Sequence, residues 1–328
     1  MLLAIAVVLL SLGSSRADPL KLRIEWSVTP QHLTPLIPLL PKSVYRHYGK
    51  SYVVEPIRMR GTGPAITALA TGDIDIAALS NQGLALAVLN AKLNCDAIAD
   101  VLQDHPPNES DSFWVRSNSG INRVEDLRGK IIAVNSLGSG DDAAVRVMLA
   151  KHGMKSEADY HMVEVRFPAM LPALESGRID LAFLVDPFSF EAEKRGKFRE
   201  LFTQRDAIGP QVSVVWVAKT SFIKAHRAVL VDFLEDEIRG RHWLRTHRPE
   251  MAQILSKLNK RPASSFASWV MTRKDATYHS PDMMFDVATL QHNIDQFVKL
   301  DALPRTIHVA DHVDLSMAKQ AAARVGVQ

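Results

Sequence analysis

Two stretches of this chain read almost alike: Thr67–Ser80 is TALATGDIDIAALS, and Pro172–Asp186 is PALESGRIDLAFLVD. Aligned on Gly72 and Gly177, they share an Ala-Leu pair, the glycine, an Ile-Asp pair and an alanine. Each pattern is typical of a helix that ends at the glycine, a short turn containing an aspartate, and a buried strand with a polar or acidic far end. The repetition predicts two related α/β lobes.

Strand and helix patterns alternate around this repeat. Leu20–Val28 alternates apolar and polar residues, as a half-buried strand does. Ile131–Val134 is a short apolar run, and the Gly-rich turn of residues 135–142 and a helical pattern ending at Gly153 follow it. The last third of the chain has mainly helical periodicity. We therefore expect an α/β protein in which each lobe is a mixed, mostly parallel sheet flanked by helices.

The composition excludes several classes of protein. The 328 residues are 47% hydrophobic and 23% charged, with 39 basic and 36 acidic residues, which is typical of an ordinary folded chain. No run of Lys or Arg is present, so no nucleic-acid partner is expected. Cys95 is the single cysteine, which excludes intrachain disulfides, Cys-pair zinc sites and iron–sulfur clusters. A chain of this length favours two lobes or domains over one core.

The first residues have the pattern of an export signal. Residues 1–12, MLLAIAVVLLSL, form an apolar run too short for a lasting membrane anchor, which needs about 20 residues. Ser15-Arg16-Ala17 resembles a signal-peptidase site, so we expect a mature, periplasmic chain that begins at Asp18. The positively charged start of most signal peptides is missing, and a buried N-terminal strand or helix is the alternative.

Two similar apolar strands suggest where the chain passes between the lobes. Ser112–Val115 (SFWV) and Val214–Val217 (VVWV) both carry a central tryptophan. We interpret them as crossover strands. They predict a first lobe of residues 18–116 and 217–328 and an inserted second lobe of residues 117–216, after a signal peptide of residues 1–17.

The order of these motifs resembles a known family. The leader, residues 61–65 (GTGPA) before the first repeat copy, residues 124–134 (VEDLRGKIIAV), the Gly-Ser-Gly turn and the second copy resemble the periplasmic substrate-binding proteins of nitrate, sulfonate and taurine type ABC importers. That family also contains thiamine-pyrimidine-precursor proteins. The resemblance implies a type II periplasmic binding fold, with two α/β lobes joined by two crossover strands that close on a small solute. It further implies a monomer that delivers the solute to a membrane permease, with no cofactor, no metal and no catalytic residue.

Candidate ligand-binding residues lie where strands end and helices begin. Open α/β sheets bind ligands beyond the carboxyl ends of their strands, next to helix N-termini. In the resembled family such positions line the cleft. In this sequence they are Thr29, Gln31, Thr62, Gly63, Ser80 and Asn81 in the first lobe and Ser139, Gly140, Asp141, Asp186 and Phe188 in the second. Helix capping explains Thr62 and Ser139 equally well. The ring of Phe188 is suited to stacking on a planar solute.

Two acidic residues bear on the charge of the ligand. Asp141 and Asp142 open a predicted helix where many relatives have neutral residues. A carboxylate that points into the cleft repels an anion and favours a ligand with an amine or with several hydroxyl or N–H donors. The alternative is that both face solvent, because first helical turns attract aspartate without any ligand. The same argument applies to Asp186.

Two other functions stay open. Some proteins of the same fold are iron-dependent pyrimidine-precursor synthases, which use clustered histidines and a Cys-rich segment. Here His279, His292, His308 and His312 are scattered, and Cys95 stands alone. A ligand-sensing subunit of a membrane receptor would use the same cleft. The solute is equally open: a sulfonate, an aromatic or other carboxylate, or a nitrogen heterocycle.

Overall fold

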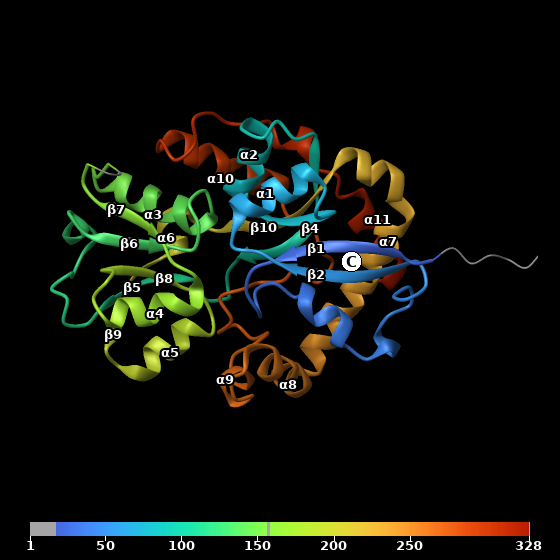
Figure 1. Cartoon of the computed structure of the whole chain (residues 1–328), viewed down its shortest axis with the longest axis horizontal. Helices are drawn as coiled ribbons and strands as arrows, with labels where there is room; N and C mark the ends of the chain where they lie inside the picture. Colours follow the sequence, from blue (N-terminus) through green and yellow to red (C-terminus); the bar gives the residue numbers. More distant parts are fainter. Residues whose placement is uncertain (1–17, 156–157, 328) are drawn as a thin grey trace, which may run out of the picture.

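Two α/β lobes lie side by side in the computed structural model, which describes residues 18–155 and 158–327 (Figure 1). The predicted signal peptide, residues 1–17, lies outside the described residues. Each lobe is built on one five-stranded sheet. Within the described ranges, no helix combines the length and the apolar character needed to cross a membrane.

The sheet of the first lobe has the order β2-β1-β3-β10-β4. Its strands are β1 (Leu20–Trp26), β2 (Tyr52–Arg58), β3 (Ile76–Ser80), β4 (Cys95–Asp104) and β10 (Gln211–Lys219). One face packs against α1 (Thr62–Thr71), α2 (Asn81–Leu89) and α10 (Val287–Lys299). The other face packs against α7 (Thr220–Thr246), α8 (Arg248–Asn259), α9 (Ser264–Ala267) and α11 (Ser316–Val325).

The sheet of the second lobe has the order β7-β6-β8-β5-β9. Its strands are β5 (Ser112–Arg116), β6 (Ile131–Val134), β7 (His161–Glu164), β8 (Leu181–Leu184) and β9 (Phe198–Thr203). In Figure 1, α3 (Gly140–Lys151) and α6 (Gln204–Ile208) lie above this sheet, and α4 (Phe167–Glu175) and α5 (Phe188–Arg195) lie below it. Short 3-10 helices cover Thr34–Leu39, Lys42–Val44, Val124–Leu127 and Val309–His312.

The internal repeat occupies the same place in both lobes. β3 and β8 are the central strands of their sheets, and every residue of both is buried. The aspartate of each copy does the same work: Asp75 accepts a hydrogen bond from the backbone N–H of Arg23 at 2.9 Å, and Asp180 accepts one from that of Ile131 at 3.0 Å. The predicted pair of related α/β lobes is confirmed.

The predicted passage points between the lobes were wrong. Ser112–Arg116 belongs wholly to the second sheet and Gln211–Lys219 wholly to the first, so the chain passes between lobes in residues 105–111 and 209–210, outside the strands. The two tryptophan strands look alike because each is the fourth strand of its sheet, antiparallel to the repeat strand, with Trp216 opposite Ala78 and Trp114 opposite Ala182. Each sheet has two parallel and two antiparallel pairs, and four of its five strands run in the same direction, so each is a mixed sheet as predicted.

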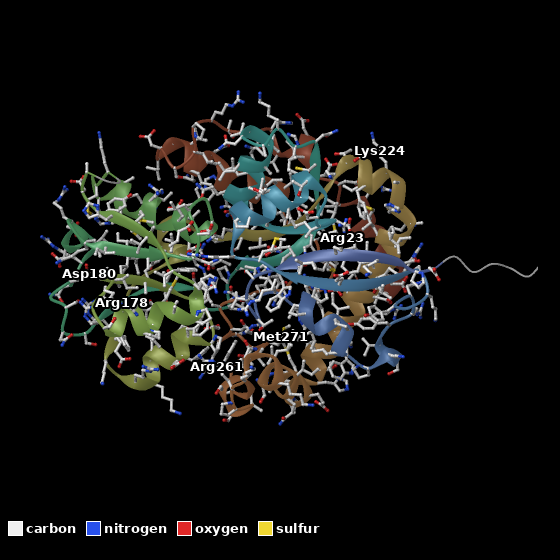
Figure 2. All side chains as sticks on the ribbon, in the orientation of Figure 1. Arg23, Arg178, Asp180, Lys224, Arg261 and Met271 are labelled. Carbon is white, nitrogen blue, oxygen red and sulfur yellow. The ribbon has the colours of Figure 1, made fainter. Side chains whose placement is uncertain are left out.

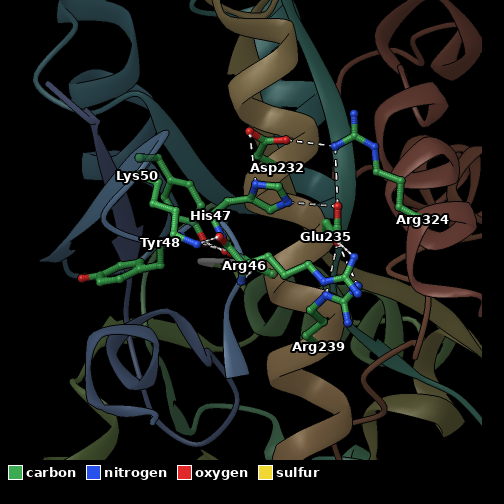
Figure 3. Close-up of polar contacts among 10 residues, drawn as sticks. Arg46, His47, Tyr48, Lys50, Asp232, Glu235, Arg239 and Arg324 are labelled. Atoms are coloured by element: carbon green, nitrogen blue, oxygen red, sulfur yellow. Dashed lines mark hydrogen bonds and ion pairs between the residues drawn. The ribbon is translucent and has the colours of Figure 1, made fainter. Parts of the chain in front are cut away.

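Acidic residues of α7 fasten neighbouring segments of the first lobe (Figure 3). The buried carboxylate of Asp236 accepts hydrogen bonds from the backbone N–H groups of residues 46–48 at 2.8–2.9 Å. Glu235 pairs with the ring of His47 at 3.1 Å and with Arg324 of α11 at 3.5 Å. These contacts hold the 45–50 loop and α11 on α7, on the side of the sheet away from α1.

Candidate functional site

A small cavity lies between the lobes, beyond the ends of β1, β3 and β6. Its volume is about 80 Å³, and residues of both lobes line it. Sites for drug-sized ligands span roughly 300–1,000 Å³. The cavity is therefore suited to a solute of a few heavy atoms, or to one end of a larger solute.

Six of the eleven predicted site residues line this cavity. They are Gln31, Thr62, Ser80, Ser139, Gly140 and Asp141. Thr62 and Ser80 lie together, with their hydroxyl oxygens 3.4 Å apart. The hydroxyl of Ser80 also accepts the N–H of Gly83 at 3.0 Å and so caps α2. Ser80 thus caps α2 and also lines the cavity.

Three predicted residues of the first lobe lie elsewhere. The hydroxyl of Thr29 donates a hydrogen bond to Asn259 of α8 at 3.0 Å. Gly63 is exposed on the first turn of α1, with open space around its Cα. The amide of Asn81 donates to Gln211 at 3.0 Å, behind the cavity wall.

Asp186 and Phe188 also lie away from the cavity, at the junction of the lobes. Asp186 accepts a hydrogen bond from the backbone N–H of Ala276 at 3.1 Å, a contact between lobes, and burial raises its pKa to about 6. The buried ring of Phe188 lies under the guanidinium of Arg261, 5.0 Å from the ring centroid. Phe188 therefore packs against an arginine side chain at this junction.

Asp141 and Asp142 are both buried, so the solvent-facing alternative was wrong. Asp141 lines the cavity, and its carboxylate accepts hydrogen bonds from the Ser139 hydroxyl and from the Asn135 N–H at 2.6 Å. Burial raises the pKa of Asp141 to about 6. Asp142 turns away and accepts from Gly138 N–H at 2.9 Å and from Arg146 at 2.7 Å. Asp141 holds the turn before α3 in shape and brings negative charge to the cavity.

Glu25 is the most consequential wall residue that the sequence interpretation missed. Its side chain is 1% exposed and lines the cavity, where its carboxylate accepts the Ala78 N–H at 3.0 Å. Burial raises the pKa of Glu25 to about 8. In the alternating run of β1, Glu25 reads as a solvent-facing position, as Lys21 does. It is buried because β1 lies between two other strands and α1 covers that face.

Two further titratable residues line the cavity. The ring of His32 is 5% exposed, and burial lowers its pKa to about 4, so it is neutral at pH 7. The carboxylate of Asp111 accepts the side-chain N–H of Gln31 at 2.6 Å, and burial raises its pKa well above the ordinary value. His32 follows the predicted site residue Gln31 in the turn after β1, whereas no local pattern places residues 25 and 111 beside it.

Two aromatic rings give the cavity an apolar wall. Phe167 and Phe183 line it from the second lobe, with centroids 6.3 Å apart and ring planes inclined by 50°. The sequence prediction named Phe188 as the stacking ring, because it directly follows the strand end at Asp186-Pro187, but Phe167 and Phe183 are the rings that line the cavity. Asn135, Gln204 and Ser213 add amide and hydroxyl groups.

The lobes touch each other around the cavity. A Cβ atom at Gly61 would lie 2.5 Å from the Cβ of Ser136 in the other lobe. Phe190 of α5 stacks on Trp269, with centroids 4.9 Å apart and planes inclined by 18°. Arg261, labelled in Figure 2, pairs with Glu191 of α5 at 2.8 Å. The two lobes are therefore in direct contact on several sides of the cavity.

A vestibule with the opposite charge adjoins the cavity. Its volume is about 480 Å³, and it shares Ser27, Asn135 and Phe167 with the cavity. Arg58, Arg60 and Arg166 line it. Arg60 pairs with Glu164 of the second lobe at 3.6 Å, and Arg58 lies over the ring of Trp26 at 5.1 Å. Arginine side chains thus lie outside the cavity, and acidic side chains line its inside.

Cys95 and the possible metal-binding side chains are two further features of the described part of the chain. Cys95 is buried in β4, and burial raises the pKa of its thiol to about 12. Among the residues described, no group of three or more His, Cys, Asp or Glu side chains is placed to hold a metal ion.

Two α/β lobes of equal topology around a solute-sized cavity define the periplasmic binding protein fold. The profile of the family described as "NMT1/THI5 like" matches residues 53–252. The chain belongs to this family.

Several known proteins are similar to this chain in sequence or in structure. The taurine-binding periplasmic protein of Escherichia coli K12 is 27% identical over 225 residues, an alignment that spans 66% of this chain and 66% of that protein, slightly under two thirds. The periplasmic nitrate-binding protein NrtA of Synechocystis PCC 6803 superposes with a TM-score of 0.72 at 15% identity and covers 94% of this chain and 90% of its own. The desulfurization enzyme DszB superposes with a TM-score of 0.64 at 13% identity over 93% and 99%. The fold is thus shared by binding proteins and by an enzyme.

Proposed function

We propose that this chain is the periplasmic solute-binding component of an ABC importer. The observation that supports this most is the cavity between the lobes: polar groups of both lobes line a space that fits a small solute. A solute that touches both lobes at once stabilises the closed form over the open form, whereas a solute that touches one lobe does not. The closed, loaded form would be the one presented to a membrane permease.

The relatives support the transport function over catalysis. The taurine-binding and nitrate-binding proteins are named as periplasmic binding proteins. The lobe contacts at Arg261 and at the Phe190–Trp269 stack provide the closing surfaces that such capture needs. Residues 1–17 would direct the export, and the mature chain, beginning at Asp18, would act as a monomer.

Calorimetry tests this function. The exported chain is titrated with taurine, alkanesulfonates, nitrate, carboxylates and small nitrogen compounds, and tryptophan fluorescence is followed in parallel, with Trp269→Phe as the reference for the contribution of Trp269. We expect one-to-one binding of at least one solute, with a fluorescence change because the indole stacks across the lobe junction. Chemical conversion of a solute, without a stable complex, would favour an enzyme of this fold. N-terminal sequencing of exported protein checks the cleavage before Asp18.

A further inference from the structure

The carboxyl group of Glu25 has no cation beside it in the described structure. The side chain is 1% exposed, and the hydrogen bond recorded for it comes from the N–H of Ala78. On β1, Leu22 and Ile24 pack into the core below the sheet, while Glu25 lines the cavity on the opposite face. An ionised carboxylate removed from water is costly unless a positive charge or several hydrogen-bond donors compensate it.

The groups that face Glu25 across the cavity do not supply such a charge. The titratable side chains on the cavity wall are Glu25, His32, Asp111 and Asp141, and no Lys or Arg of the described residues lines it. His32 is neutral at pH 7, as its lowered pKa shows. The arginines of the neighbourhood line the vestibule, where Arg58 and Arg60 already have the partners described above.

Two buried polar atoms of wall residues lack a partner. They are Nδ1 of His32 and Oδ1 of Asp111, which have no hydrogen-bond partner in the described structure. Buried polar atoms without partners are rare and costly. The wall of the cavity therefore holds unsatisfied polar atoms as well as the uncompensated carboxyl group of Glu25.

We propose that the cavity takes the protonated nitrogen of a small amine or amidinium solute, with Glu25 as its counter-ion. This inference rests on the proposed solute-binding function and specifies its ligand. A sulfonate, nitrate or carboxylate group in the cavity would face three acidic side chains. An acidic group on the same solute lies outward, toward the arginines of the vestibule.

The Glu25→Gln variant distinguishes a charged counter-ion at position 25 from a neutral hydrogen-bond donor. If the protonated carboxyl of Glu25 merely donates a hydrogen bond, the glutamine amide replaces it and affinity stays. If Glu25 is the counter-ion, the variant loses a charge-assisted contact, and affinity falls by about 10- to 100-fold. Glu237→Gln is the matched control, because Glu237 is 4% exposed, burial also raises its pKa to about 8, and it lies on α7 away from the cavity.

The probes are pairs that differ mainly at the nitrogen: ethylammonium and ethanol, acetamidinium and acetamide, taurine and isethionate, with nitrate added. Binding is measured by calorimetry at pH 7.5 on the wild type and both variants. We expect binding within the panel to be restricted to nitrogen cations, to weaken in Glu25→Gln and to persist in Glu237→Gln. Equal binding of isethionate or nitrate, unchanged affinity in Glu25→Gln, or no binding of any nitrogen cation overturns the proposal. Anion binding that closes the lobes would overturn this inference while leaving the solute-binding function intact.

Discussion

At the scale of single residues, the burial of Glu25 couples stability to pH. Its pKa is raised by burial from 4.5 to about 8, so between these values the folded chain holds one proton more at this site than the unfolded chain. The stability this proton provides is complete below pH 4.5 and is lost as pH rises toward 8.

Glu25→Gln should therefore flatten the pH dependence of stability. Between pH 5 and 8 we expect the free energy of unfolding of the wild type to fall more steeply than that of the variant, by up to about 1.4 kcal/mol per pH unit. Urea denaturation at four pH values measures both slopes. Parallel slopes would show that Glu25 titrates normally and that its burial has no electrostatic cost.

Arg241 is a second residue whose effect can be predicted. Its guanidinium pairs with Asp100 at 2.9 Å, and the two side chains are 3% and 0% exposed. Removing one partner of a buried ion pair leaves an uncompensated charge, which costs about 3–5 kcal/mol. Arg241→Ala should lose that much stability in urea denaturation. Arg239→Ala removes a pair with Glu235 whose side chains are 21% and 3% exposed. Glu235 keeps His47 and Arg324 as partners, so this loss should be smaller than that of Arg241→Ala. Similar losses in both variants would contradict this reasoning.

At the scale of elements, the start of α1 controls the approach of the lobes. Gly61 has φ +71°, and a Cβ there would meet Ser136 of the second lobe. An added methyl group therefore obstructs closure at the edge of the cavity.

Gly61→Ala should weaken solute binding by about tenfold or more, since a penalty on the closed form reduces the apparent affinity directly. Gly120→Ala is the matched control: Gly120 has φ +76° but open space around it, so it carries the same backbone strain without the clash. The measurement is the dissociation constant of a solute that the wild type binds. Equal affinities of the two variants would mean that Gly61 does not limit closure.

The elements also show how far the sequence is informative. The helix–glycine–strand repeat was predictable because it is local and occurs twice. The two tryptophan strands were wrongly predicted to be crossovers between the lobes. Ser112–Arg116 and Gln211–Lys219 resemble each other because they occupy the same position in their two sheets. Site residues next to helix starts, such as Thr62 and Ser139, were found through cap and turn patterns. Glu25 and Asp111 were not predicted, since their proximity arises from strand order and from the way the two lobes meet.

At the scale of the whole molecule, contacts around Arg261 favour the closed form. Arg261 of the first lobe pairs with Glu191 of the second and covers the ring of Phe188. We expect Arg261→Ala to reduce solute affinity by about three- to tenfold, from the loss of a partly exposed ion pair and a cation–π contact. Arg195→Ala removes another partner of Glu191 within the second lobe and should leave affinity unchanged. Equal losses in both variants would assign the effect to Glu191 itself.

The most direct test of solute capture is the size of the molecule with and without its solute. Small-angle scattering of the exported chain gives the radius of gyration before and after saturation with a solute that calorimetry shows to bind. We predict a smaller radius in the loaded state, as the lobes close to the arrangement in which Gly61 meets Ser136. Stoichiometric binding without contraction would contradict capture between two closing lobes.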